Sequence, residues 1–141
     1  MMADLAGSRS LDNLRAAFSL EAQSNRRYLW FAQQADVEGL PEVAELFRSI
    51  AESETGHAIG HLEFLADSGD PATGAPIGSS RDNLRSAMLS EQREAQEIYR
   101  GFADSARAEG FEDLAEWFEL VGAAEARHAE RFRAVLDRLE G

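Results

Sequence analysis

The chain has 141 residues, the usual length of one domain, and its apolar fraction of 44% and charged fraction of 28% are typical of a globular protein. Its formal net charge of −12 argues against nucleic acid or an anionic membrane as a partner, because both attract basic surfaces. The chain has no Cys, which excludes disulfides, iron–sulfur clusters and thiolate zinc sites.

Residues 1–10 are small and polar, and we expect them to form a flexible N-terminus. They lack the basic and apolar segments of a signal peptide. Further along the chain, no apolar run approaches the ~18 residues of a membrane span. A cytoplasmic protein is therefore expected.

Apolar residues at helical spacing predict four helices, over residues 11–38, 41–67, 81–109 and 111–139. Ser10 and Ser80 are suited to cap the first and third helices. Gly39 and Gly110 suit the short turns within the two helix pairs, and Pro41 suits the start of the second helix. The second helix is expected to bury an apolar stripe formed by Val43, Leu46, Phe47, Ile50, Ile59, Leu62 and Leu65.

The second half of the chain repeats the first. The segment Asp-Asn-Leu-Arg at residues 12–15 recurs at residues 82–85, an offset of 70 residues. Beyond Glu91 the offset becomes 71, so that Tyr28 matches Tyr99. One extra residue inside a helix that keeps both flanks in phase predicts a π-bulge between Glu91 and Tyr99, a feature often found at functional sites.

Each half is therefore predicted to be one helical hairpin. Residues 68–79, rich in Gly, Pro and Ala, form the only long loop, and they are numerous enough to cross the length of a bundle. We predict an all-α, ferritin-like antiparallel four-helix bundle of two helical hairpins joined by a long crossover loop. This domain occupies residues 11–139.

Two Glu-x-x-His motifs occupy equivalent places in the repeat, Glu54 with His57 and Glu125 with His128. Residues three apart share a helix face, so each motif aims a carboxylate and an imidazole at one point. With one Glu from each first helix, this is the ligand set of a di-iron or di-manganese site in a four-helix bundle. Glu21 and Glu91 are the candidates for those two positions.

Chance and solubility provide an alternative, since Glu is abundant in this chain and common on helix surfaces. Both motifs, however, fall on apolar faces, where carboxylates are costly unless they are paired or bound to metal. Glu94 follows Glu91 by one turn and is an additional candidate. Tyr28 and Tyr99 could point into the same cavity, although Tyr is equally often a core residue. His61 is expected to lie in the core or beside a ligand rather than to bind metal.

The motifs resemble the rubrerythrin family over about residues 11–139. The resemblance is carried by the segment from Leu20 to Tyr28, the two Glu-x-x-His motifs, and Glu94 beside Glu91 with Tyr99 downstream. It implies a non-haem di-iron peroxidase in which a reduced site gives two electrons to hydrogen peroxide. Manganese is the alternative metal for such a carboxylate-rich site.

The resemblance also implies a role for each ligand. Glu54 and Glu125 would bridge two irons, and Glu91 with His128 would hold one of them.

The second iron would be held by Glu21, together with Glu94 in the oxidised state and His57 in the reduced state. The resemblance therefore implies a catalytic role for four residues, which are Glu94, His57, Tyr28 and Tyr99.

One departure from the family is large. Many rubrerythrins carry a Cys-rich rubredoxin-type domain, and this sequence has no Cys, so we expect electrons to come from a separate donor such as a rubredoxin-type protein. The family commonly forms homodimers, and the loop at residues 68–79 could permit an exchange of hairpins. Two other readings remain open: an iron-binding or ferroxidase protein that oxidises Fe(II), and a metal-free bundle that acts through its surface.

Overall fold

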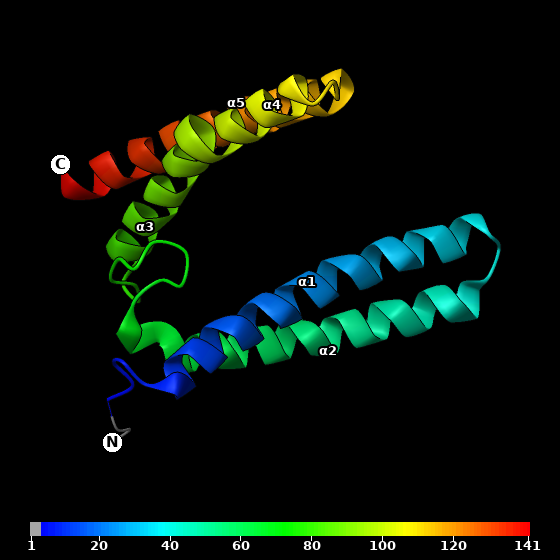
Figure 1. Ribbon diagram of the computed structural model, residues 1–141. Helices are drawn as coiled ribbons and strands as arrows, with labels where there is room; N and C mark the ends of the chain where they lie inside the picture. Colours follow the sequence, from blue (N-terminus) through cyan, green and yellow to red (C-terminus); the bar gives the residue numbers. More distant parts are fainter. Residues whose placement is uncertain (1–3) are drawn as a thin grey trace. The chain divides into compact units, whose positions relative to one another are not determined.

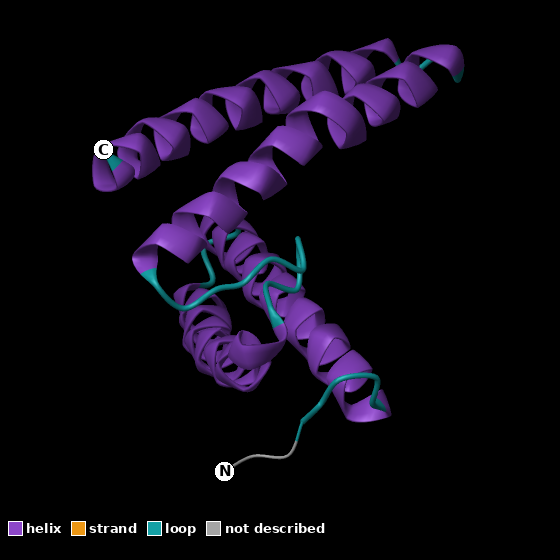
Figure 2. Ribbon diagram, turned by 90° about the vertical axis from the view of Figure 1, so that its left-hand side faces the viewer, coloured by secondary structure: helices purple, strands orange, loops and turns teal. Residues whose placement is uncertain are grey.

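The computed structural model describes residues 4–141, which divide into two compact units at Pro71 and Ala72 (Figure 1). Every regular element within residues 4–141 is a helix (Figure 2). Each unit contains one long helical hairpin, with helices α1 and α2 in the first unit and α3 to α5 in the second. The predicted all-α fold of two hairpins is confirmed. None of the helices in the described chain is long and apolar enough to cross a membrane.

The first hairpin pairs α1 (Arg9–Val37) with α2 (Pro41–Leu65). Gly39 takes a φ of 74°, a left-handed conformation that glycine adopts without strain, and Pro41 stands at the start of α2, as predicted. The predicted cap of α1 is wrong by two residues. The side chain of Ser8, and not that of Ser10, accepts the backbone N–H of Leu11 at 3.0 Å.

Alanine forms the seam between α1 and α2. The residues that lie fully within this contact are Ala32, Ala35, Ala44 and Ala51, all at most 4% exposed. Small side chains let the two helix backbones approach closely. The predicted apolar stripe of α2 is only partly covered by this seam. Leu65 is buried, whereas Leu46 and Ile59 are 60% and 53% exposed, because one partner helix covers only one side of α2.

The second hairpin is interrupted by a π-helical segment. Helix α3 (Ser80–Arg93) continues as the π-helix η2 (Glu94–Ile98) and then as α4 (Tyr99–Ala108). This confirms the π-bulge that the change of repeat offset predicted. Gly110, with a φ of 87°, turns the chain into α5 (Glu112–Glu140), which packs along α3, η2 and α4. Ser79, rather than Ser80, caps α3 by accepting the N–H of Asp82.

The crossover loop is attached at both ends. Helix α2 is followed directly by the 3-10 turn η1 (Ala66–Ser68). On the other side, Thr73 Oγ1 lies 2.5 Å from Oγ of Ser86, a fully buried residue of α3. The backbone N–H of Gly78 donates to Oδ1 of Asn83 at 2.8 Å. The loop from Thr73 onward is therefore fastened to α3.

Candidate metal centre

The first candidate ligand cluster lies within the first hairpin. Glu21 on α1 and Glu54 and His57 on α2 place one ligand atom each within 4.8 Å of the others. Nδ1 of His57 lies 3.5 Å from Oε2 of Glu21 and 3.8 Å from Oε1 of Glu54. The carboxylates are only 24% and 18% exposed, whereas the imidazole is 60% exposed. The two carboxylates are therefore mostly buried, and solvent reaches the cluster on the side of the imidazole. We call these three residues the first triad.

The second triad, Glu91, Glu125 and His128, repeats this arrangement in the second hairpin. Nδ1 of His128 lies 3.5 Å from Oε1 of Glu91, the same separation as between His57 and Glu21. Glu91 is 19% exposed and the imidazole 47%. Glu91 and Glu21 come from the first helix of their hairpins, and the Glu-x-x-His motifs from the second. Each hairpin therefore brings together three of the predicted ligand residues.

The chemistry of the triads fits a metal cation. Oε2 of Glu21 and Oε2 of Glu91 are buried and have no hydrogen-bond partner among the described residues. A buried carboxylate oxygen without a partner is costly, and a bound cation satisfies it. Carboxylate and imidazole ligands without thiolate suit iron or manganese. These two unpartnered oxygens occupy equivalent positions of the repeat, so each hairpin has one buried carboxylate oxygen that a cation could bind.

An aromatic trio lies next along each hairpin. The ring of Tyr28 lies 6.1 Å from Phe31 and 6.0 Å from Phe47 between centroids. In the second hairpin, Tyr99 lies 5.8 Å from Phe102 and 6.0 Å from Phe118. Both Tyr side chains are half-buried. The rings therefore pack against neighbouring aromatic side chains as core residues do.

Glu94 and His61 stand outside the triads. Glu94 begins the π-helix η2 and is half-buried, and it belongs to neither cluster of ligand atoms. His61 is also half-buried and likewise absent from both clusters. Within residues 4–141, the structure therefore brings together six of the seven predicted metal ligands, three in each hairpin.

Asn25 braces the first hairpin, a contact that the sequence analysis did not single out. Its Nδ2 donates to the carbonyl of Ala51 and to Oγ1 of Thr55, both at 2.8 Å. These bonds tie α1 to α2 one turn from Glu21 and Glu54. Asn25 lies within the segment that carries the family resemblance, but a half-exposed amide on a helix gives no signal of its own.

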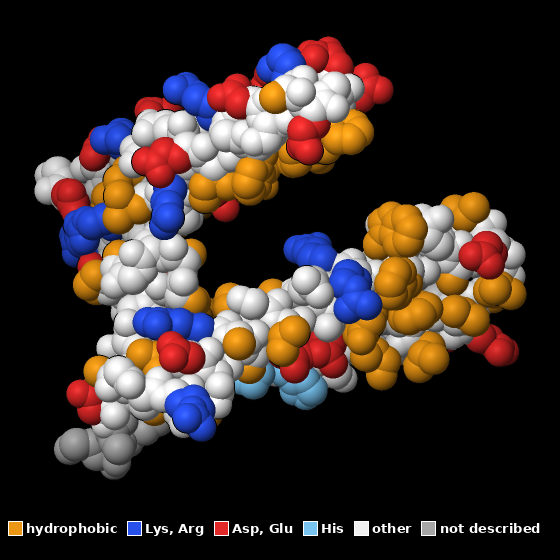
Figure 3. Space-filling model, in the orientation of Figure 1, with side chains coloured by type: hydrophobic (Ala, Val, Ile, Leu, Met, Phe, Trp, Pro, Cys, Tyr) orange, Lys and Arg blue, Asp and Glu red, His pale blue; other side chains and the backbone are white. Residues whose placement is uncertain are grey.

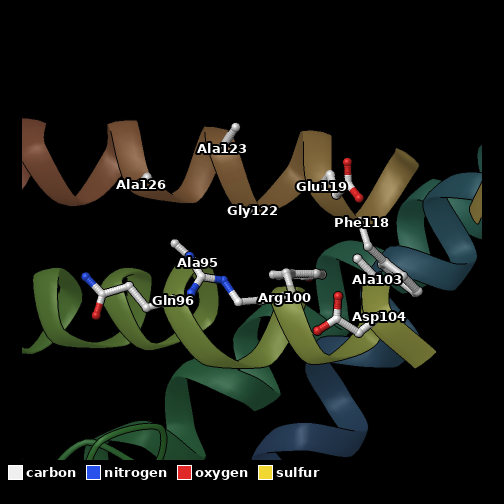
Figure 4. A pocket seen from close by; sticks show the side chains of 11 residues that line it. Ala95, Gln96, Arg100, Ala103, Asp104, Phe118, Glu119, Gly122, Ala123 and Ala126 are labelled. Atoms are coloured by element: carbon white, nitrogen blue, oxygen red, sulfur yellow. The ribbon is translucent and has the colours of Figure 1, made fainter. Parts of the chain in front are cut away.

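In the second hairpin, a cavity of about 450 Å³ opens between α5 and the π-helix (Figure 4). Ala95, Gly122 and Ala126 form part of its wall, and Arg100 lies beside it. Tyr99 lines this cavity, but none of the six triad residues does. A second cavity, of about 530 Å³, is lined in part by His128 and Phe132.

An all-α chain that carries one Glu from the first helix and Glu-x-x-His from the second helix of each hairpin defines a protein of the ferritin-like carboxylate class. The comparison with family models identifies it further. The rubrerythrin model matches residues 12–76 and 82–141, and the chain belongs to the rubrerythrin family. The family assignment also confirms the ferritin-like fold class.

Curated relatives support the same assignment. The chain is 33% identical to Rubrerythrin-1 of Clostridium acetobutylicum, over 99% of this chain and 75% of the relative. It is 35% identical to rubrerythrin of Porphyromonas gingivalis, over 99% of this chain and 72% of the relative. Among solved structures, the fully reduced state of nigerythrin (all ferrous) aligns with 29% identity and a TM-score of 0.45, over 100% of this chain and 73% of that one.

Proposed function

We propose that the two triads together hold a dinuclear iron centre, and that the protein is an oxidoreductase that reduces hydrogen peroxide to water. The observation that carries this proposal is the pair of buried, unpartnered carboxylate oxygens on Glu21 and Glu91, each belonging to a carboxylate 3.5 Å from an imidazole nitrogen. Two equivalent half-sites suit two metal ions, and membership of the rubrerythrin family supports iron.

Each ligand has a place in this proposal. Glu91 and His128 hold one iron, and Glu21 holds the other. By the family resemblance, Glu54 and Glu125 would each supply a carboxylate to both ions.

The remaining ligand position would be filled by different side chains in the two redox states. We assign His57 to the reduced form and Glu94 to the oxidised form. The high exposure of the His57 imidazole and the separation of Glu94 from the triad are consistent with side chains that bind in different states. When bound, an iron pair supplies the two electrons that convert one peroxide and two protons into two waters.

Tyr28 and Tyr99 are proposed to orient peroxide and to donate hydrogen bonds to its oxygens. Their rings are held by the aromatic trios, which fixes the direction of the hydroxyl groups. The electrons are proposed to come from a separate donor, such as a rubredoxin-type protein, since residues 1–141 contain no Cys with which to bind an iron–sulfur relay.

The test is anaerobic loading with Fe(II), a count of iron per chain, and stopped-flow oxidation of the loaded protein. We expect two irons per chain and faster oxidation by hydrogen peroxide than by dioxygen. Faster oxidation by dioxygen would instead favour a ferroxidase, which handles iron as its substrate. A protein that binds no iron above the level of a Glu21→Ala/Glu91→Ala variant would refute both readings.

A further inference from the structure

The first triad combines ligands from two helices, so its geometry depends on how α1 is held against α2. Glu21 comes from α1, whereas Glu54 and His57 come from α2. A ligand cluster binds metal well only when its members are held within about 0.5 Å of their working positions. The contacts that fix one helix against the other beside the triad therefore bear directly on metal binding.

The imidazole of His57 has few contacts of its own to hold it. It is 60% exposed, and within residues 4–141 its charged neighbours are the two carboxylates of the triad. Figure 3 shows histidine side chains at the surface of the α1–α2 hairpin, next to acidic ones. The position of this imidazole is therefore set mainly by the turn of α2 that carries it.

Asn25 ties α1 to that turn through a closed set of hydrogen bonds. It lies one turn after Glu21, and its Nδ2 donates to the carbonyl of Ala51 and to Oγ1 of Thr55, both at 2.8 Å. The hydroxyl of Thr55 donates to the same carbonyl at 3.3 Å. Ala51 is only 1% exposed, so water competes little for the bond to its carbonyl.

The turn that receives these bonds carries two of the three ligands. Glu54 lies directly before Thr55, and His57 follows two residues after it. A helical turn moves as a unit, because its backbone groups are hydrogen-bonded to one another. Fixing Thr55 against α1 therefore also fixes the level of both ligands relative to α1.

The second hairpin has a cavity where the first hairpin has this tie. By the repeat, Ala51 corresponds to Gly122, Thr55 to Ala126, and Asn25 to Ala95 or Gln96 on the two sides of the inserted residue. All four residues of the second hairpin line the cavity of about 450 Å³ shown in Figure 4. Ala126 has no hydroxyl group, so the set of hydrogen bonds seen in the first hairpin cannot form there.

The second hairpin is held at this level by close packing instead. Gly122 of α5 is buried, and a Cβ added to it would lie 3.4 Å from Cβ of Tyr99. The absence of a side chain lets α5 lie directly against the start of α4. The hydrogen-bonded tie is therefore particular to the first triad.

We infer that Asn25 is a positioning residue for the metal ligands of the first triad. It binds no metal itself. Through its bonds to α2 it sets where Glu54 and His57 stand relative to α1. This inference rests on the proposed metal centre and adds a residue, outside the predicted ligands, on which the geometry of that centre depends.

Titration of the full chain with cobalt(II) tests the inference. A site that binds iron(II) binds cobalt(II) at least as tightly, and the visible absorption of bound cobalt(II) depends on its ligand geometry. We expect Asn25→Ala to weaken cobalt binding by about 10-fold, as when a group that orients a metal ligand is removed, and to change the visible spectrum. Thr55→Val should act in the same direction, whereas Thr55→Ser keeps the hydroxyl and should retain the wild-type affinity and spectrum.

Two controls separate positioning from stability. Ser8→Ala removes the cap of α1, which accepts the N–H of Leu11, and so destabilises the same hairpin away from the triad. Gln96→Ala removes an exposed amide at the equivalent place of the second hairpin. Both variants should bind cobalt as the wild-type protein does.

The outcomes distinguish this inference from the proposed function. If Asn25→Ala keeps the wild-type affinity and spectrum, or if Ser8→Ala weakens binding equally, the inference is overturned while the metal centre stands. If Asn25→Ala does not fold, equal cobalt affinity in Thr55→Val and Thr55→Ser would overturn the inference. If the wild-type protein binds no cobalt, the proposed metal centre is itself refuted.

Discussion

Nδ1 of His57 on α2 lies 3.5 Å from Oε2 of Glu21 on α1, and that oxygen is buried without a hydrogen-bond partner in the described chain. The contact joins the two helices of the first hairpin at the candidate centre. It recurs between His128 and Glu91 in the second hairpin. The Glu21 carboxylate therefore has a buried oxygen available to bind a cation. Its negative charge is the first property to test.

Replacing Glu21 by Gln should lower the iron content of the protein by half or more. The amide keeps the size of the side chain but removes the negative charge and one oxygen ligand. Iron per chain is measured after anaerobic loading and desalting. Glu63→Gln, which changes an exposed carboxylate of α2 outside the triad, is the matched control and should retain full iron. Equal iron in both variants would remove Glu21 from the ligand set.

Glu94→Ala should leave iron bound but slow the repeated reduction of peroxide. Six triad ligands remain in this variant, whereas the proposed ligand of the oxidised state is lost. Steady-state turnover with peroxide and a chemical reductant is compared with iron content. Glu97→Ala is the control, because Glu97 lies in the same π-helix and is exposed. Unchanged turnover in Glu94→Ala would show that the proposed role is wrong.

Asn25→Ala should destabilise the first hairpin by about 1–2 kcal/mol, because two hydrogen bonds between α1 and α2 are lost. Urea unfolding followed by circular dichroism measures the change. Gln96→Ala alters an exposed amide of the π-helix, close to the equivalent position of the repeat, and should cost much less. If the two variants lose the same stability, the Asn25 bonds are not a brace.

Gly110→Ala should destabilise the second hairpin by about 1–2 kcal/mol, since a φ of 87° is strained for a residue with a Cβ. Gly101→Ala should do the opposite. Gly101 is inside α4, a Cβ there meets nothing within 4 Å, and alanine favours the helix by up to about 1 kcal/mol. Opposite shifts of the urea midpoint are expected, and a destabilised Gly101→Ala would contradict the exposed position assigned to it.

The internal repeat made the centre of each hairpin predictable. It placed Glu21 and Glu91 at equivalent positions, and the change of offset after Glu91 located the π-helix at Glu94–Ile98. The caps were harder to predict. Serines at 8 and 10, and at 79 and 80, are equally suited by type, and only the backbone geometry selects Ser8 and Ser79.

The sequence pattern was less informative about burial. The pattern predicted burial of large apolar residues such as Leu46 and Ile59, which one hairpin alone leaves exposed. The docking of Thr73 on Ser86 was also not predictable, because a hydroxyl contact between a loop and a helix has no periodicity. The burial of a side chain and the contact of a loop with a helix both depend on which surfaces pack against each other. The helical periodicity of a sequence does not show this.

The alanine seam between α1 and α2 has a consequence for how the molecule forms. Alanine buries little area, so a single hairpin gains too little from its internal contact to offset the ordering of two long helices. Most of the driving force must come from the larger side chains on its open face. Stability is therefore expected to depend on what covers that face, and a melting temperature that rises with protein concentration would identify the cover as a second copy of the chain.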